Sequence, residues 1–177
     1  MKFTYMKTPL YRYTFKNRRV REWVEQHVEG FTLNLFAGKY LLDCKEVRND
    51  IRPDMEADYY MDALDFVTGW KGDKFKTVVL DPPYAYRKSM EMYDSAVSSR
   101  FNQVKNHIPN ILAPNGIVIT FGYHSNVMGK TRGFKQEHIL LMSHSGAIHD
   151  SIAVIERKDD GLTREEIGVF FDVSGIS

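Results

Sequence analysis

The stretch Phe75-Lys76-Thr77-Val78-Val79-Leu80-Asp81-Pro82-Pro83-Tyr84 decides the fold. Its first six residues are mostly apolar or β-branched, which predicts a buried strand over 75–80. The two prolines end that strand, because proline lacks the N–H that a central strand must donate. They also make a stiff, extended turn whose carbonyls are not taken up by a helix and can accept hydrogen bonds beside an aspartate.

Such a turn is suited to holding an amino group. The Asp81 carboxylate and a neighbouring backbone carbonyl can accept its two hydrogens, and the ring of Tyr84 offers a face on which a planar base stacks. Catalysis would then rest on positioning and electrostatic stabilisation. The structural alternative is a strand that ends at proline, with Asp81 capping the turn.

The segments around this stretch alternate between strands and helices. The patterns predict strands over 32–37, 46–51, 116–123, 138–143 and 148–156, helices over 16–28 and 97–112, and short helical or irregular structure over 55–67. Strands that alternate with helices predict an α/β fold with a mostly parallel sheet covered on both faces. The last two strands flank Ser145-Gly146, which predicts a C-terminal antiparallel hairpin.

Polar and glycine-containing turns follow several of these strands. Phe36-Ala37-Gly38 ends the first strand, Asp50 ends the second, and Asp81 follows the buried strand. Ligands of open α/β sheets bind beyond the carboxyl ends of the strands. We therefore expect these residues to meet at one site.

An Asp-Pro-Pro-Tyr motif after a buried strand resembles that of the amino-methyltransferase branch of the class I, Rossmann-like S-adenosylmethionine-dependent methyltransferases. This branch includes DNA adenine-N6 and cytosine-N4 methylases and some RNA guanine-N2 methylases, and the similarity covers roughly residues 31–158. It implies a doubly wound, Rossmann-like sheet of seven strands and S-adenosyl-L-methionine as the cofactor. It also implies that Asp81 and the Pro82 backbone bind the target amine, that Pro83 completes the turn, and that Tyr84 stacks on the flipped base.

The resemblance extends to three candidate cofactor segments. The run that includes Asn34, Phe36, Ala37 and Gly38 is similar to the family's Phe-x-Gly-x-Gly loop, although Lys39-Tyr40 replaces the portion with the second glycine. Asp50-Ile51 matches the acidic position that binds the ribose hydroxyls, and Asp62-Ala63 resembles the motif that accepts from the adenine amino group. The alternative for Asp50 is an aspartate at a strand end that caps a turn, and the alternative for Asp62-Ala63 is a common residue pair that occurs by chance.

Positive charge is concentrated at the N-terminus. Residues 1–21 carry seven basic and no acidic residues: Lys2, Lys7, Arg12, Lys16, Arg18, Arg19 and Arg21. The remaining residues carry a net charge of −6, although the whole chain carries only +1. This asymmetry indicates a contact with a polyanion, and the interleaved aromatic residues suit bases. The alternatives are a solvated basic helix face and aromatic rings that pack on the sheet.

We expect an enzyme that methylates an exocyclic amine of a nucleic-acid base, most simply N6 of adenine in DNA. DNA is favoured over RNA as the partner, and a homodimer would suit recognition of a short site. An RNA guanine-N2 methyltransferase and a non-catalytic nucleic-acid-binding domain remain open. The expected organisation is a basic, aromatic arm and helix over 1–30, a methyltransferase core over 31–158 and a C-terminal extension over 159–177.

Composition narrows the setting of this activity. No apolar stretch reaches the ~18 to 20 residues of a membrane span, and we expect no membrane contact. The single cysteine, Cys44, does not require an oxidising compartment, so the expected location is cytoplasmic. His124, His144 and His149 lack the spacing of a metal site, and we expect no metal.

Overall fold

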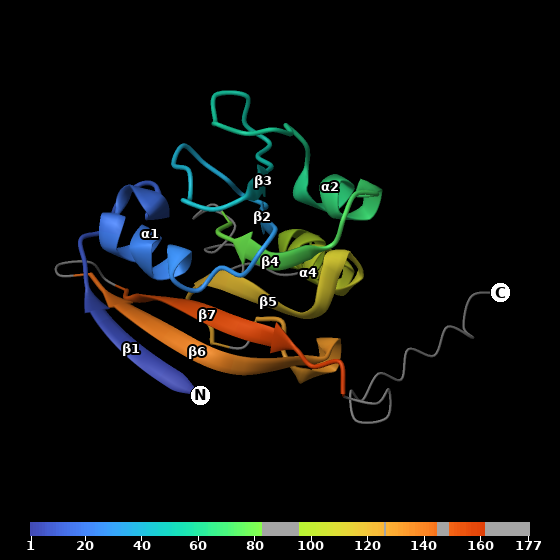
Figure 1. The fold of residues 1–177 in the computed structure, drawn as a ribbon. Helices are drawn as coiled ribbons and strands as arrows, with labels where there is room; N and C mark the ends of the chain where they lie inside the picture. The colour runs from blue at the N-terminus through green and yellow to red at the C-terminus, as the bar shows by residue number, and fades with distance from the viewer. Residues whose placement is uncertain (83–95, 126, 145–148, 162–177) are drawn as a thin grey trace.

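The structure, a computed structural model, describes residues 1–82, 96–125, 127–144 and 149–161. Within them, seven strands form one mixed sheet in the order β1-β6-β7-β5-β4-β2-β3 (Figure 1). The strands are β1 (Lys2–Lys7), β2 (Thr32–Asn34), β3 (Glu46–Arg48), β4 (Phe75–Leu80), β5 (Leu112–Gly122), β6 (Phe134–Ser143) and β7 (Ser151–Lys158). The helices are η1 (Thr14–Lys16), α1 (Arg18–Glu25), α2 (Ala63–Gly69), α4 (Ala96–Ile111) and η2 (Lys130–Arg132).

The sheet is mostly parallel, as the sequence predicts. β7 runs antiparallel to its neighbours β5 and β6, whereas the other pairs of adjacent strands run parallel. The antiparallel pair β6–β7 confirms the predicted C-terminal hairpin, although its Ser145-Gly146 turn lies outside the described residues.

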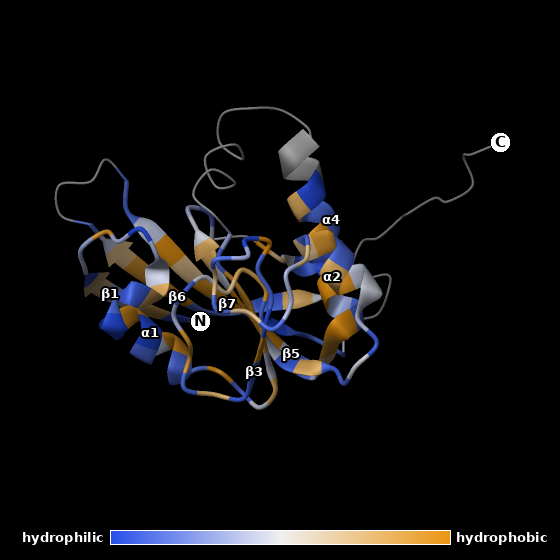
Figure 2. Cartoon of the chain, turned by 90° about the horizontal axis from the view of Figure 1, so that it is seen from above, coloured by the Kyte–Doolittle hydropathy of each residue, from blue (hydrophilic) through white to orange (hydrophobic). Residues whose placement is uncertain are grey.

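Helices cover both faces of the sheet. α2 and α4 pack on one face, where Val78 and Leu80 of β4 belong to the same apolar cluster as Phe101 of α4. α1 packs on the other face, where Val79 of β4 joins a second cluster with Trp23 of α1. Figure 2 shows α1 at one side of the molecule and α2 with α4 at the other. The alternation along β4 is the period of two of a strand buried on both faces.

The connection from β2 to β3, residues 35–45, contains no helix, and the sequence also predicts none there. The N-terminal segment, predicted as an arm outside the core, contributes β1, which pairs with β6 from Lys2↔His138 to Lys7↔Ser143. Its aromatic residues Phe3 and Tyr5 point outward and Met6 inward, so the largest apolar side chains do not mark the buried face.

The turn before η2 is fixed by a buried carboxylate. Glu156, only 1% exposed, accepts hydrogen bonds from the backbone amides of Met128 (2.8 Å) and Gly129 (2.9 Å). Lys105 of α4 is also buried, and burial together with the nearby Arg132 charge lowers the pKa of its ammonium to about 8, although Glu156 acts in the opposite direction.

Lys105 makes the stability of the fold depend on pH. Between about pH 8 and 10.5 the unfolded chain keeps a proton on Lys105 that the folded chain has released, so its contribution to the free energy of unfolding rises with pH. In urea titrations, we expect wild type to gain stability relative to Lys105→Met between pH 8 and pH 10. The exposed Lys74→Met serves as the control and should show no such difference. A constant gap between wild type and Lys105→Met would contradict the assignment.

Candidate functional site

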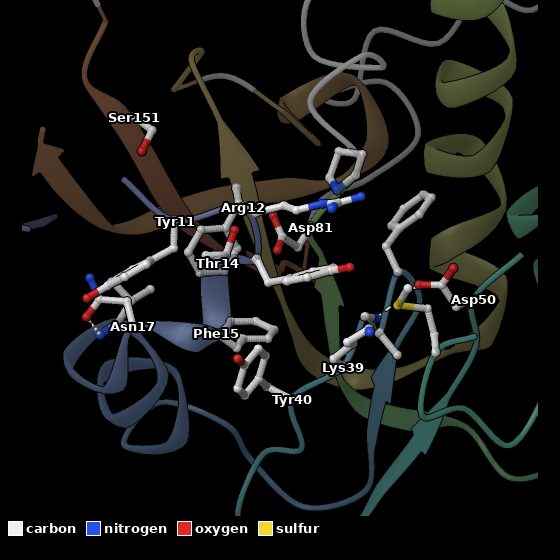
Figure 3. Close-up of a pocket in the computed structure, with 18 of the residues that line it drawn as sticks. Tyr11, Arg12, Thr14, Phe15, Asn17, Lys39, Tyr40, Asp50, Asp81 and Ser151 are labelled. Carbon is white, nitrogen blue, oxygen red and sulfur yellow. Dashed lines mark hydrogen bonds between the residues drawn. The ribbon is translucent and has the colours of Figure 1, made fainter. Parts of the chain in front are cut away.

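A pocket of about 720 Å³ lies at the carboxyl ends of β2, β3, β4 and β5 (Figure 3). This volume is within the range of roughly 300–1,000 Å³ that small-molecule sites occupy. One wall is formed by the turns after β2 and β3 and the start of α2. The opposite wall is formed by residues from Thr8 to Asn17 together with His144 and Ser151 at the end of the hairpin.

Most of the candidate cofactor residues line the first wall. These are Phe36, Ala37, Gly38, Asp50, Ile51, Asp62 and Ala63. Asn34 is not brought into the pocket: it is fully buried in β2, and its Nδ2 donates to Glu46 Oε2 (3.3 Å). Asn34 is the last residue of β2, in register with Arg48 of β3, and its side chain is engaged by β3 and does not line the pocket.

Gly38 and Asp50 are joined directly. Gly38 has a φ of +62°, in the left-handed region that glycine adopts without a steric penalty. Its amide donates to Asp50 Oδ2 (3.0 Å), and the Arg52 amide donates to Asp50 Oδ1 (3.0 Å). Each carboxylate oxygen keeps a further lone pair, so Asp50 can hold the loop and still accept from two ligand hydroxyls.

Arg48 holds the same loop from below and was not singled out by sequence reasoning. Its buried guanidinium donates to the carbonyls of Ala37 and Gly38 (3.2 Å each) and pairs with Glu46 (2.7 Å). Because no helix follows β2, these bonds from Arg48 fix the backbone of the residues after that strand. In the three-residue strand β3, Arg48 is buried whereas Glu46 and Val47 are half-buried, and nothing in the sequence marks the arginine as the buried residue.

The left-handed backbone at Gly38 predicts the effect of adding a side chain there. A non-glycine residue in this conformation costs about 1–2 kcal/mol, so Gly38→Ala should lower the free energy of unfolding by that amount. Gly69→Ala is the control, because a Cβ added there meets nothing within 4 Å and its φ is ordinary. Chemical denaturation compares the two; equal stability of the two variants would show that the turn is not strained.

Asp62 caps the N-terminus of α2. Its Oδ1 accepts from the Leu64 amide (2.9 Å) and pairs with Arg100 of α4 (3.0 Å). Partial burial alone would raise the pKa of Asp62, but the hydrogen bonds from Arg100 and Leu64 outweigh it and hold the pKa below its usual value. The carboxylate is therefore ionised near neutral pH, and its Oδ1 already caps α2 and pairs with Arg100.

Asp81 and Pro82 lie in the same pocket at the end of the central strand β4. Leu80 is fully buried and pairs with Thr120 of β5, which fixes the point at which the chain leaves the sheet. Asp81 is half-buried and Pro82 is buried. Pro83 and Tyr84, the other members of the predicted catalytic motif, lie outside the described residues.

The opposite wall is held by a serine–histidine pair. His144 Nδ1 lies 3.0 Å from the carbonyl oxygen of Thr8, and its Nε2 lies 2.7 Å from Ser151 Oγ. Because a carbonyl only accepts, Nδ1 carries the proton and Ser151 donates to Nε2. This pair ties the segment after β1 to the hairpin and so keeps residues 8–17 over the pocket.

Among the residues that the structure describes, no group of three or more histidine, cysteine, aspartate or glutamate side chains is placed to hold a metal ion. No helix in the same residues is long and apolar enough to cross a membrane.

Neither a protein-family model nor a curated protein sequence matches this chain. Solved structures do. The chain is similar to the N-methyltransferase NodS from Bradyrhizobium japonicum WM9, with a TM-score of 0.59 and 12% identity over 81% of this chain and 96% of that chain. NodS has also been solved in complex with S-adenosyl-L-homocysteine.

Two other structures extend the comparison. The 1,6-didemethyltoxoflavin-N1-methyltransferase from Burkholderia thailandensis, solved with bound 1,6-didemethyltoxoflavin and S-adenosylhomocysteine, has a TM-score of 0.59 and 10% identity, covering 81% of this chain and 78% of that one. TrmN from Thermus thermophilus has a TM-score of 0.56 and 12% identity, covering 79% of this chain and 47% of that one. Identities this low establish a shared fold alone: the mixed α/β sheet of this chain is arranged as in these solved proteins.

Proposed function

We propose that this chain is an S-adenosylmethionine-dependent methyltransferase that acts on an exocyclic amine of a nucleic-acid base, most specifically N6 of adenine in DNA. One observation carries the proposal: Asp81 and Pro82, in the turn after β4, line the same pocket as Gly38 and Asp50, which are hydrogen-bonded to each other. A cofactor on the loop and an amine on the turn would therefore share one enclosed volume.

The first wall suits the cofactor. Asp50 offers carboxylate lone pairs to a ribose diol, and the left-handed Gly38 keeps side-chain atoms away from the backbone at that point. Phe36, Ile51 and Met61 provide apolar surface for a planar base. When bound, S-adenosylmethionine supplies a methyl group on a positively charged sulfur, which is electrophilic.

Asp81 and the Pro82 backbone would hold the target amine. The carboxylate and a carbonyl accept its two N–H hydrogens, which leaves the nitrogen lone pair directed at the methyl carbon. The nitrogen would form its new bond to the methyl carbon as the bond from that carbon to sulfur breaks with its electron pair on sulfur, and the nitrogen would then release one proton to solvent water. Asp81 stabilises the positive charge that develops on the nitrogen, which is electrostatic catalysis by a preorganised group.

DNA is the proposed substrate because an aspartate in the first motif position and a tyrosine in the last suit adenine methylation, and because the basic N-terminal segment borders the pocket. We include a homodimer in the proposal, because two copies of the chain would suit recognition of a short site.

The test is methyl transfer from labelled S-adenosylmethionine to unmethylated DNA and, separately, to total RNA. The proposal expects label on DNA in excess of RNA. Label on RNA alone would transfer the assignment to guanine N2, and calorimetry with the cofactor alone identifies the non-catalytic alternative, for which no heat of binding is expected.

A further inference from the structure

Five side chains at the mouth of the pocket combine positive charge with aromatic rings. We call them the rim cluster: Tyr11, Arg12, Tyr13, Lys16 and Lys39. Arg12 Cζ lies 5.6 Å and Lys39 Nζ 6.0 Å from the centroid of the Tyr13 ring, and Lys16 Nζ lies 5.4 Å from that of Tyr11. Tyr13 thus joins the segment after β1 to the loop after β2, across the pocket mouth.

The positive charges of the rim cluster differ from those of the adjacent helix. On α1, Arg18 pairs with Glu22 (2.6 Å) and Arg21 with Glu25 (3.6 Å), whereas Arg19 donates to the Lys7 carbonyl (3.3 Å). Within the part of the chain that the structure describes, Arg12, Lys16 and Lys39 form no ion pair and each lies over a tyrosine ring, although the Lys39 charge also helps to lower the pKa of Asp54. An anion can therefore bind the rim cluster without displacing a carboxylate.

The rim cluster also runs from inside the pocket to outside it. Arg12, Lys39 and both tyrosines line the pocket, whereas Lys16, on η1, does not. Figure 3 shows the Arg12 side chain extending across the pocket in the direction of Asp81. A small molecule with one phosphate would use only the inner positions. A chain of phosphates that leaves the pocket would use all three.

We infer that the rim cluster binds single-stranded DNA on either side of the target nucleotide, an inference that rests on the proposed function. Arg12 binds the phosphate of the nucleotide in the pocket, and Lys16 and Lys39 bind the phosphates that flank it. Tyr11, 40% exposed, stacks on a neighbouring base. Lys39, which together with Tyr40 replaces the portion of the family's loop that holds the second glycine, is thereby assigned to the substrate.

The test is the salt dependence of binding of the full chain to a fluorescently labelled, adenine-containing single-stranded oligonucleotide. Each lost phosphate contact on a single strand lowers the slope of log K against log salt by about 0.7, which corresponds to about fivefold weaker binding at 0.1 M salt. We expect this for Lys16→Gln and for Lys39→Gln. Arg18→Gln, which removes a charge already paired with Glu22, should leave the slope unchanged.

Tyr11→Ala separates stacking from charge. Loss of one stacked base should weaken binding about tenfold while leaving the salt slope as in wild type. Thermal unfolding of each variant, with a midpoint within about 2 °C of wild type, shows that the fold is retained, because surface substitutions of this kind have small effects on stability.

Two results would overturn the inference: no binding of the oligonucleotide at low salt, or equal slopes for Lys16→Gln, Lys39→Gln and Arg18→Gln. Neither result depends on methyl transfer. If DNA is methylated and the slopes are equal, the proposed function stands and the rim cluster has no role in phosphate binding. If the slopes change as expected and DNA is not methylated, the binding surface stands and the proposed function fails.

Discussion

Asp81→Ala is expected to lower kcat for methyl transfer by about 10²- to 10³-fold, the usual cost of removing one preorganised electrostatic contact from a transition state. The substitution removes the carboxylate that accepts from the target amine and leaves its developing charge unbalanced. Cofactor affinity should change little, because Asp81 follows β4 whereas the cofactor loop follows β2. Single-turnover kinetics at saturating cofactor measure the chemical step directly.

Two further variants make this result specific. Asp81→Asn keeps one acceptor oxygen but loses the charge, so its rate should fall between those of wild type and Asp81→Ala. Asp73→Ala removes the same charge at an exposed position outside the pocket and should leave the rate unchanged. Full activity of Asp81→Ala would show that Asp81 only caps the turn after the strand.

Asp50→Ala is expected to raise the Kd for S-adenosylmethionine by about 10- to 100-fold, because hydrogen bonds to a charged acceptor contribute about 1.5–3 kcal/mol. Part of the effect is indirect, since Asp50 also accepts from the Gly38 and Arg52 amides that shape the loop. Calorimetric titration at a temperature well below the unfolding midpoint separates affinity from stability.

Asp54→Ala is the matched control. Asp54 lies on the same loop as Asp50, pairs with Arg52 (2.7 Å) and does not line the pocket. Its removal takes away an equal charge near the site, so cofactor affinity should stay within about twofold of wild type, as for an exposed ion pair. If Asp50→Ala and Asp54→Ala weakened cofactor binding equally, the loss would come from the change in net charge near the site, and Asp50 would have no direct contact with the cofactor.

The sequence predicts the centre of the sheet better than its edges. β4 is found with its residue limits as predicted, because a short apolar run between charged residues and two prolines admits few alternatives. The edge strand β1 was not predicted, since its aromatic residues face outward and its pairing with β6 joins residues more than 130 positions apart. No local pattern reports a contact of that range.

In the candidate site, too, the residues at the centre of the sheet could be predicted from the sequence, and those that depend on its edge strand could not. Gly38, Asp50 and Asp81 could be placed together from the rule that strand ends face one edge of the sheet. The opposite wall, with Arg12, His144 and Ser151, depends on β1, which carries the segment after it over the pocket. The charge asymmetry of residues 1–21 was visible in the sequence, but its position beside the pocket was not.

The most direct test of the account is the identity of the methylated product. Unmethylated DNA is incubated with the protein and S-adenosylmethionine carrying a labelled methyl group, then digested, and the nucleosides are separated. The account predicts label in N6-methyladenine, abolished in Asp81→Ala. Absence of label from DNA, by protein that binds the cofactor, would contradict it.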